Sequence, residues 1–502
     1  MDDTHVPDFS LDPADLPGLK RRLSTWPEAD QLPDVELDRV IVGSDALHAL
    51  PDALSGLGVA DGGDVLLVTD TTPMSRGGED LKPEVGRMLG EAGYAVRTLT
   101  LQPGDDGLVH AGEHELGTVK DALREGDAVV SVGSGVVTDL AKHACLTFDD
   151  ERDSGRHTPL VTVATANSMV AYSARLAVIT NKDGVKRTSP SRLGDVLVLD
   201  TPTLRDAPEL STSAGIGDAS AMYVSFGDWY LGNQFGLGQY LQACWDVLDD
   251  VRRLLLPWAG QMGERTDAGV ETLAKCLFLC GFSGTLAMES APLSGYEHVN
   301  GHMLDMSADY HDRPTGSHGL QVGVATIPCS IAFNILLDEL DPSTVDVDDC
   351  QPSFEDMEQR IHASFDHLDP SGGIAEECWS DYRQKLEAWH GARDELTAFL
   401  GAWDRHRSTL RELVPPPEDV VEALHTGGVP LAYEELTPAV SEDNARWAFH
   451  NAHLMRKRFS SADLLCYLGW FDEAFTDRVF TRMRQLTGSA RGGGPAPTRD
   501  VD

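Results

Sequence analysis

The chain has 502 residues, 41% of them hydrophobic, and carries a formal net charge of −41. This length and composition predict a soluble globular protein with at least two domains. The negative charge argues against nucleic acid and anionic membrane surfaces as partners, because it repels polyanions. We find no uninterrupted apolar run near the about 18 residues of a membrane span, and the acidic N-terminus lacks the features of a secretory signal. A cytoplasmic protein is therefore expected.

Residues 1–33 form an acidic N-terminal extension, and a different pattern begins after them. Short runs rich in β-branched residues then alternate with helical stretches as far as residue 205. Such runs are typical of parallel strands buried on both faces. We predict strands at Arg39–Val42, Val65–Asp70, Ala95–Leu99, Ala128–Val132, Pro159–Val163 and Val196–Leu199. Residues 34–205 are therefore expected to form a doubly wound α/β domain that binds a dinucleotide.

A glycine-rich turn, Gly133-Ser134-Gly135, connects a predicted strand to a predicted helix. Glycines let a backbone approach a pyrophosphate, and a helix N-terminus offers N–H groups and a positive dipole end. The alternative is a turn that uses glycine for steric reasons alone. Asp139 and Lys142, one helical turn apart, make the pattern more specific, although they could also form an ordinary ion pair on the helix.

Asp70 ends the predicted strand Val65–Asp70. A carboxylate in this position can accept hydrogen bonds from ribose hydroxyls and repel a 2′-phosphate, which would favour NAD over NADP. The alternative is a helix N-cap in the sequence Asp70-Thr71-Thr72-Pro73. The sequence leaves both interpretations open.

The chain changes character after Pro208. Long amphipathic stretches, such as 239–262 and 269–291, predict a largely helical domain over residues 206–487. Residues 488–502 have the composition of a disordered tail. The eight cysteines include no Cys-x-x-Cys pair, so we expect them to be reduced and non-catalytic.

Histidines in this second half suggest a metal site. His298 and His302 are four residues apart, so in a helix they share one face. His318 precedes a glycine, and Asp218 follows Gly215-Ile216-Gly217, which we interpret as a bend. Such residues could form a mixed nitrogen and oxygen shell with one open position, as in catalytic zinc sites. Beside the glycine-rich turn, this set indicates metal-dependent oxidation of an alcohol or reduction of a carbonyl.

Together these residues resemble the sn-glycerol-1-phosphate dehydrogenase branch of the iron-containing alcohol dehydrogenase and dehydroquinate synthase superfamily. The resemblance covers about residues 35–335, and its motifs occur in the family's order. The matching motifs are Asp70, Gly133-Ser134-Gly135 with Asp139 and Lys142, Thr165-Ala166-Asn167-Ser168-Met169, Asp200 through Pro208, Gly215-Ile216-Gly217-Asp218, Asp228-Trp229, Glu297-His298 with His302, and His318-Gly319 with Gln321-Val322-Gly323.

The resemblance implies a dehydroquinate synthase-like fold, with an N-terminal Rossmann-like α/β domain and an all-α C-terminal metal-binding domain. It makes Asp218, His298 and His318 the metal ligands and His302 a substrate contact or proton relay. Zinc is the expected metal, with iron(II) or nickel as alternatives. The implied residues for NAD, or alternatively NADP, are Asp70, Gly133, Ser134, Gly135, Asp139, Thr165 and Ser168.

The expected function is a metal-dependent, NAD(P)-linked oxidoreductase that interconverts a small alcohol, which could be phosphorylated, and its ketone. Asp218 and His302 are its expected catalytic residues, and a homo-oligomer is expected. The alternatives are a dehydroquinate synthase-like lyase or cyclase that uses NAD transiently, and a diverged non-catalytic relative. Val170-Ala171 stands where the family has an Asp-Gly pair that contacts substrate hydroxyls. Candidate cations for a substrate phosphate are Lys186, Arg187 and Arg192, and the alternative is that they belong to the solvated tip of a hairpin.

Overall fold

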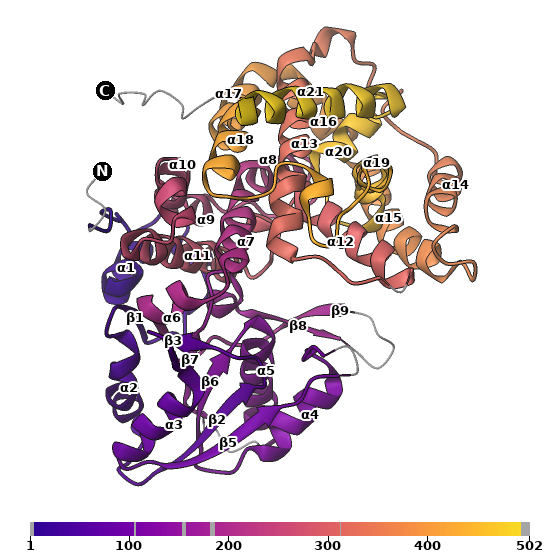
Figure 1. Cartoon of the computed structure of the whole chain (residues 1–502). Helices are drawn as coiled ribbons and strands as arrows, with labels where there is room; N and C mark the ends of the chain where they lie inside the picture. The colour runs from indigo at the N-terminus through magenta and orange to yellow at the C-terminus, as the bar shows by residue number, and fades with distance from the viewer. Residues whose placement is uncertain (1–4, 105–106, 153–156, 181–185, 312, 493–502) are drawn as a thin grey trace. The chain divides into compact units, whose positions relative to one another are not determined.

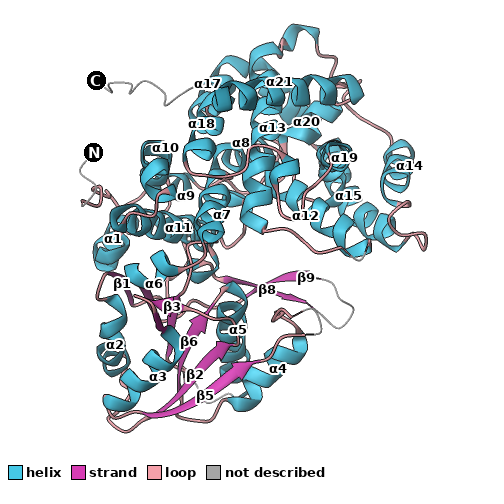
Figure 2. Cartoon of the chain, viewed as in Figure 1, coloured by secondary structure: helices cyan, strands magenta, loops and turns pink. Residues whose placement is uncertain are grey.

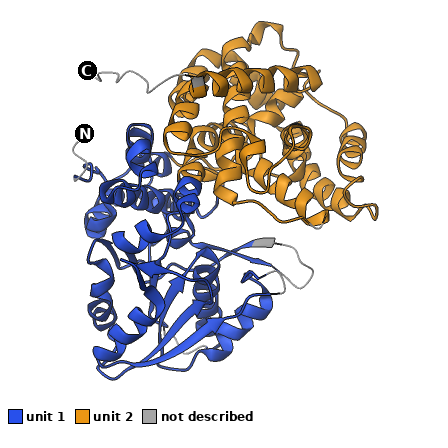
Figure 3. Ribbon diagram, in the orientation of Figure 1, with its two compact units in different colours: residues 1–215, 242–290 blue, residues 216–241, 291–502 orange. Residues whose placement is uncertain are grey.

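The computed structural model describes residues 5–104, 107–152, 157–180, 186–311 and 313–492 (Figure 1). The chain divides into two compact units, which Figure 3 colours separately. Unit 1 comprises residues 1–215 and 242–290, and unit 2 comprises residues 216–241 and 291–502. Unit 1 contains a parallel sheet, whereas the described part of unit 2 consists of helices and loops (Figure 2).

The sheet of unit 1 has six strands in the order β1-β10-β7-β6-β2-β5, and every neighbouring pair is parallel. The strands are β1 (Arg39–Gly43), β2 (Asp64–Asp70), β5 (Ala95–Leu101), β6 (Ala128–Gly133), β7 (Leu160–Ala164) and β10 (Val196–Asp200). The predicted strands and the predicted fold class are thereby confirmed.

Both faces of this sheet are covered by helices. Val65 and Leu67 of β2 pack into a core with α2 (Leu50–Gly56) and α3 (Leu81–Glu91). The alternate residues Leu66 and Val68 face the other way, into a core with α4 and α5. Successive side chains of a strand point to opposite faces, so a strand covered on both sides must be apolar throughout. The helices of the second face are α4 (Glu113–Ala122) and α5 (Gly135–Arg152). After the last strand of the sheet, the chain continues into α6 (Thr201–Asp206) and α7 (Glu209–Ser220).

The order of the strands reverses between β2 and β6. From β2 the chain moves outward to β5 and then returns to the opposite side of β2 to form β6. In open parallel sheets, ligands bind outside the carboxyl ends of the strands at such a switch point. Asp70 ends β2 and Gly133 ends β6. The predicted nucleotide residues therefore lie where this topology favours a ligand.

The compact units do not follow the predicted domain boundary at residue 205. Residues 242–290, predicted as part of the helical domain, group with the α/β unit. They form α9 (Gln242–Val247), α10 (Asp249–Gly263) and α11 (Asp267–Ala287). The buried Asp250 of α10 accepts hydrogen bonds from the backbone N–H of Leu11 (3.0 Å) and the hydroxyl of Ser10 (2.9 Å). The N-terminal extension, with its helix α1 (Leu16–Leu23), is thus bound to these helices.

The central helix of unit 2 is α13 (His318–Glu339), which packs against α8, α12, α17, α18 and α21. By length and composition alone, α11 and α13 could span a membrane, which our search for uninterrupted apolar runs missed. Within the protein, however, 83% and 94% of their apolar windows are buried. Their apolar side chains therefore already form protein core. Unit 2 contains α8 (Met222–Gln234), α12 (Tyr296–Tyr310), α13, α14 (Phe354–Phe365), α15 (Gly373–Gly391), α16 (Arg393–Gly401), α17 (Trp403–Leu413), α18 (Pro417–Thr426), α19 (Glu442–Asn451), α20 (Ser461–Tyr467) and α21 (Glu473–Gly492).

Two further predictions concern the end of the chain and the cysteines. The last helix, α21, runs to Gly492. A disordered tail that begins at residue 488 is therefore wrong for residues 488–492, and residues 493–502 lie outside the described part of the chain. All eight cysteines are free thiols, as predicted, and burial raises the pKa of Cys145 to about 12. Such a thiol is poorly suited to nucleophilic chemistry.

Candidate metal centre and nucleotide turn

A close crossing of two helices places Asp218 beside His318. Gly217 and Asp218 lie inside α7, so our interpretation of the preceding segment as a bend is wrong. A Cβ on Gly217 would lie 2.2 Å from the carbonyl oxygen of Gly319, and one on Gly323 would lie 2.9 Å from the Cα of Gly217. These glycines therefore let the backbones of α7 and α13 touch. The first residue of α13, His318, is brought next to Asp218 as a result.

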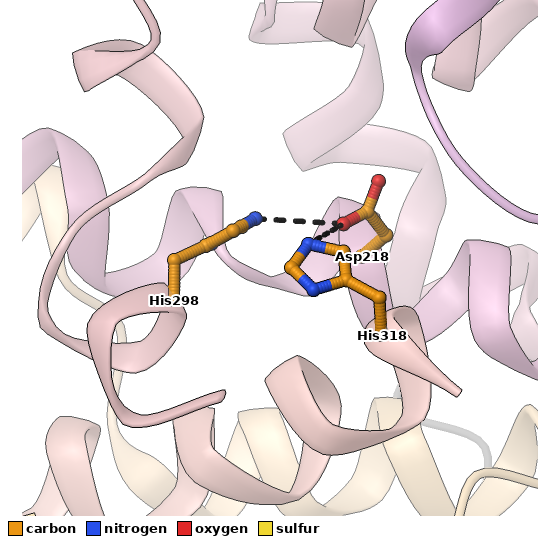
Figure 4. A group of neighbouring side chains, drawn as sticks. All are labelled: Asp218, His298 and His318. Atoms are coloured by element: carbon orange, nitrogen blue, oxygen red, sulfur yellow. Dashed lines mark ion pairs between the residues drawn. The ribbon is translucent and has the colours of Figure 1, made fainter. Parts of the chain in front are cut away.

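Asp218, His298 and His318 form a compact group (Figure 4). The Nε2 atom of His298 lies 3.5 Å from Oδ1 of Asp218, and Nε2 of His318 lies 3.9 Å from the same oxygen. Tetrahedral ligands at bond lengths of about 2.0–2.2 Å are separated from one another by roughly 3.4 Å. The observed separations are close to that value. Two imidazoles and a carboxylate at this spacing fit a divalent cation with one position left for another ligand.

A second carboxylate supports His298 from behind. Glu297 is fully buried, and its Oε1 lies 3.0 Å from Nδ1 of His298. Burial lowers the pKa of His298, but the carboxylates of Asp218 and Glu297 outweigh this effect and raise the pKa to about 9. A positive charge is therefore favoured between these two carboxylates. A bound cation would occupy the same electrostatic position.

His302 lies one turn further along α12. Its ring centroid is 6.5 Å from that of His298 and 5.4 Å from that of His318, with which it stacks. His302, Asp305 and His318 also bring ligand atoms within 4.8 Å of one another. The structure thus gathers Asp218, His298, His302 and His318 in one place, as the sequence predicts.

The glycine-rich turn connects β6 to α5, as predicted. A Cβ on Gly133 would lie 2.5 Å from Val137, and one on Gly135 would lie 2.3 Å from the sulfur of Met169. Packing inside the domain therefore already requires glycine at both positions, so their presence alone does not indicate a ligand. Ser134, half-buried between them, receives a backbone hydrogen bond from Thr138 at 3.0 Å. The first N–H groups of α5 have no intrahelical acceptors, which makes this helix end suited to an anion.

Asp70 is buried at the carboxyl end of β2. Its carboxylate accepts hydrogen bonds from the backbone N–H of Thr72 (3.2 Å) and from the Thr72 hydroxyl (3.1 Å), and it forms an ion pair with Lys82. The N-cap of α3 is Asp80, so the alternative that Asp70 caps a helix does not describe it. Instead, Asp70 closes a side-chain turn of the loop after β2. Lys82 partly neutralises the charge that would repel a 2′-phosphate.

Asp139 and Lys142 form an ion pair of 2.9 Å, and both are buried. Lys142 also donates to the backbone carbonyls of Ala171, Ala174 and Leu176, at 2.9 to 3.0 Å. Asp139 accepts the N–H of Val178 at 3.0 Å. These contacts tie α5 to the segment that leads into strand β8 (Leu176–Thr180). The packing of α5 against this segment therefore explains the ion pair.

Thr165 follows the end of β7, which neighbours β6 in the sheet. The hydroxyl of Tyr172 receives the N–H of Thr165 (3.4 Å) and donates to the carbonyl of Gly133 (3.3 Å). This tyrosine, to which we assigned no role from the sequence, thus links the two loops that carry predicted cofactor residues. Ser168 is half-buried three residues beyond Thr165.

Two residues bear on substrate contacts. Val170 is half-buried, and its carbonyl accepts the N–H of Ser173 at 3.1 Å. Arg192 is only 4% exposed, and its guanidinium binds Asp195 (2.9 Å) and the carbonyl of Thr158 (3.0 Å). Arg192 is therefore engaged within unit 1, which speaks against it as a phosphate ligand. The side chains of Lys186 and Arg187 lie outside the described residues.

Comparison with known proteins gives a consistent family resemblance. The model of one family, described as iron-containing alcohol dehydrogenase, matches residues 41–208. The chain is 24% identical over 315 residues to a glycerol-1-phosphate dehydrogenase [NAD(P)+] of Bacillus subtilis, which covers 62% of this chain and 76% of that protein. It is 28% identical over 293 residues to the protein of the same name from Methanosarcina mazei, covering 57% and 74%.

Solved structures that align over most of the chain show the same fold. Glycerol dehydrogenase from Schizosaccharomyces pombe aligns with a TM-score of 0.52 and 16% identity, covering 91% of this chain and 93% of that one. Maleylacetate reductase from a Rhizobium strain aligns with a TM-score of 0.52 and 14% identity, covering 92% and 99%.

The chain resembles the iron-containing alcohol dehydrogenases in sequence and in fold. The resemblance inferred from the motifs is thereby confirmed. The names of the matching family and relatives support an alcohol dehydrogenase-type enzyme.

Proposed function

We propose that this protein is a metal-dependent, NAD(P)-linked oxidoreductase that interconverts a small alcohol and its ketone. The observation that carries the proposal is the group of Asp218, His298 and His318, whose donor atoms have the spacing and chemistry of a divalent-cation site. Zinc is the first metal to test, and iron(II) and nickel are its alternatives. The family's relatives, several of which are named for a dehydrogenase activity on glycerol 1-phosphate, support the same class of reaction.

The three ligand residues would hold the cation through Oδ1 of Asp218 and the Nε2 atoms of His298 and His318. A bound divalent cation and a bound nicotinamide would supply Lewis-acid polarisation of the substrate oxygen and a hydride acceptor or donor. Asp218 contributes negative charge, and the two imidazoles contribute neutral donors. The ligand set thus carries a net charge of about −1, which leaves a positive centre to attract an alcohol oxygen.

His302 is the group that we propose moves the proton. It stacks against His318, with ring centroids 5.4 Å apart, and so lies at the edge of the ligand group without belonging to it. Alcohol oxidation releases one proton from the hydroxyl, and an imidazole can accept it near neutral pH. In the direction of ketone reduction, the same ring would return the proton to the developing alkoxide.

The nucleotide would bind at the switch point of the unit 1 sheet. Gly133 and Gly135 flank the turn between β6 and α5, and the helix N-terminus suits a pyrophosphate. Asp70 ends β2 and Thr165 follows β7, the two strands that neighbour β6. Because the carboxylate of Asp70 ends β2, where it can bind ribose hydroxyls, we propose that the coenzyme is NAD. The ion pair of Asp70 with Lys82 keeps NADP as the alternative. We do not assign cofactor contact to Asp139, since Lys142 and the N–H of Val178 already engage its carboxylate.

The substrate that we propose to test first is glycerol 1-phosphate, beside its ketone and unphosphorylated polyols. Val170 lacks the carboxylate that the family uses to bind substrate hydroxyls, and a lost hydrogen bond of this kind typically costs about 1–3 kcal/mol. A substrate with fewer hydroxyls than glycerol 1-phosphate would not incur that cost. The screen should therefore include simple phosphorylated alcohols.

Metal analysis combined with a coupled NADH absorbance screen tests the proposal. The wild-type protein should retain close to one divalent metal per chain and turn over at least one alcohol or ketone of the panel. Asp218→Ala should lose both metal and turnover. Asp309→Asn, which removes an exposed carboxylate from α12, is the matched control and should keep both. Unchanged metal content in Asp218→Ala would reject the ligand assignment.

A further inference from the structure

The buried side chain of Glu297 bonds to the start of its own helix, but this leaves half of its carboxylate unexplained. It is 0% exposed, and in the described part of the chain its single ion-pair partner is the neighbouring His298. Oε1 receives both the backbone N–H of Gly295 (2.7 Å) and Nδ1 of His298 (3.0 Å), while Oε2 is buried and has no hydrogen-bond partner among the described residues. Burying a carboxylate with one oxygen left without a hydrogen bond costs free energy, unless a positive charge lies nearby.

The start of α12 is shaped to hold this carboxylate. Gly295 precedes the first helical residue, and a Cβ there would lie 2.8 Å from Oε2 of Glu297 and 2.8 Å from Oδ2 of Asp228. Only glycine leaves room for both carboxylates. Asp228 in turn accepts the N–H of Tyr296 at 2.8 Å. The first turn of α12 is thereby fixed, and Glu297 is held against His298 rather than turned toward solvent.

This contact determines which imidazole nitrogen is available. When Nδ1 donates its hydrogen to Glu297, the lone pair of the neutral ring is on Nε2. Nε2 is the atom that faces Asp218, at 3.5 Å. Histidine ligands of metals commonly donate their other ring N–H to a carboxylate, which fixes the ring and increases its basicity.

We infer that Glu297 is a positioning residue for the metal centre: it orients His298 and supplies the second negative charge behind the cation. This inference rests on the proposed function, because it presupposes that Asp218, His298 and His318 bind a metal. It goes beyond that function in assigning part of the metal affinity to a residue that does not touch the metal. Removing the carboxylate should weaken metal binding without dismantling the ligand group.

The test is the affinity of metal-free protein for Zn²⁺, measured by competition with a chromophoric chelator. Glu297→Gln keeps an oxygen that can accept from Nδ1 but loses the charge, whereas Glu297→Ala loses both. We expect roughly 10-fold weaker binding for Glu297→Gln and roughly 100-fold weaker binding for Glu297→Ala. The control Asp309→Asn, one exposed carboxylate fewer on the same helix, should bind within about twofold of wild type, as expected for a distant and screened charge.

Two further measurements separate positioning from simple folding support. Metal-free Glu297→Gln should unfold close to the wild-type temperature, because the amide oxygen can still accept from Gly295 and His298 and because Asp218 still balances a charge on His298. The visible absorption spectrum of the Co²⁺ form should change in Glu297→Gln and stay unchanged in Asp309→Asn. Wild-type affinity in both Glu297 variants, with binding lost in Asp218→Ala, would overturn the inference and leave the proposed function standing. Failure of the wild-type protein to bind Zn²⁺ would overturn both.

Discussion

Gly217 permits the contact between α7 and α13 because it has no side chain. Replacing it with alanine would put a methyl group 2.2 Å from the carbonyl oxygen of Gly319, so one helix must move. Overpacking of this kind typically costs about 1–3 kcal/mol. We expect Gly217→Ala to lower the free energy of unfolding by that amount and to weaken Zn²⁺ binding, because Asp218 moves away from His318. Denaturant unfolding and chelator competition measure the two effects.

Gly301 provides the matched control for Gly217. It also lies in a buried helix of unit 2, but a Cβ there would meet Val322 at 3.7 Å, an ordinary contact. Alanine at this position should keep wild-type metal affinity and gain a fraction of the roughly 1 kcal/mol by which alanine exceeds glycine in helix propensity. Equal behaviour of the two alanine variants would contradict the role assigned to Gly217.

His453 should make the fold sensitive to mild acid. Its ring is buried among Tyr296, Tyr382 and Phe471, and neither nitrogen has a hydrogen-bond partner in the part of the chain that the structure describes. Burial, helped by nearby cations, holds its pKa well below the usual 6.5. The folded state therefore keeps the ring neutral, while the unfolded chain takes up a proton below about pH 6.5. Stability should fall as the pH decreases below that value, by up to about 1.4 kcal/mol per pH unit from this group.

The substitution His453→Leu tests the predicted direction of this pH dependence. Removing the titrating ring should flatten the decrease in unfolding free energy between about pH 6.5 and 5, above the range where most carboxylates titrate. Urea unfolding at several pH values measures the slopes. A wild-type slope in His453→Leu would refute the assignment.

At the metal centre, local sequence predicted part of the arrangement and tertiary packing decided the rest. The spacing of His298 and His302 is a helical repeat, so their common face followed from periodicity alone. Asp218 and His318 are 100 positions apart in the chain, so no local pattern connects them. Their donor chemistry suggested a shared site, and the family resemblance assigned them as ligands. The sequence could not show that Gly217 serves a helix crossing, because a glycine in a turn and a glycine in a tight helix contact look alike.

Among the elements, a buried ion pair joins α15 to α20. Lys385 and Asp463 are both 0% exposed and lie 2.7 Å apart, and Lys385 also donates to the carbonyl of His453 at 2.7 Å. Removing one partner would leave the other charge buried and uncompensated, which typically costs 3–5 kcal/mol. We therefore expect Lys385→Met to lower the free energy of unfolding by about 3–5 kcal/mol in urea titrations.

The neighbouring surface pair on α15 gives the control. Arg383 and Glu387 are 60% and 53% exposed and lie 3.0 Å apart. Exposed pairs one turn apart contribute less than about 1 kcal/mol, so Arg383→Met should change stability little. If Lys385→Met lowered the free energy of unfolding as little as Arg383→Met, the buried ion pair would not be what holds α20 in place.

The C-terminal helices also support α12, the helix that carries His298, a role that we could not assign from the sequence. Asp228 accepts the first N–H of α12, from Tyr296, and the first N–H of α20, from Ser461, at 2.8 and 2.7 Å. Burial, together with the charge of Glu297, raises the pKa of Asp228 to about 7. The aromatic ring of Tyr296 packs against Phe449 and Phe471. Residues beyond 340 therefore form part of the same compact unit as the candidate metal ligands.

The parallel sheet was the most predictable part of the fold. Continuous β-branched runs appear wherever a strand is buried on both faces, and this pattern is local. The grouping of α9, α10 and α11 with unit 1 was not predictable in the same way. Their amphipathic pattern shows that one face is buried, but not against which partner. The partner is determined by contacts between residues distant in sequence, such as the hydrogen bonds of Asp250 with residues near the N-terminus.

For the molecule as a whole, the net charge of −41 should determine the response to salt. Like charges repel one another more strongly in the compact state than in the unfolded chain, and salt screens this repulsion. We expect the unfolding temperature to rise between about 0.05 and 1 M KCl, where the Debye length falls from more than 10 Å to about 3 Å. Scanning calorimetry measures the shift.

Sucrose at matched osmolality is the control for general solute effects on the unfolding temperature. It is excluded from the protein surface but does not screen charge. KCl should stabilise the protein more than sucrose does. An unfolding temperature that falls with KCl would mean that the surface ion pairs, which salt weakens, outweigh the overall repulsion.

The central claim is that one divalent cation binds to Asp218, His298 and His318. Anomalous X-ray diffraction at the zinc edge, from crystals of protein loaded with one equivalent of Zn²⁺, tests it most directly. The account predicts a single strong anomalous peak at about 2.0–2.2 Å from Oδ1 of Asp218 and the Nε2 atoms of the two histidines. A peak at other residues, or imidazoles of His298 and His318 that do not share an ion, would contradict it.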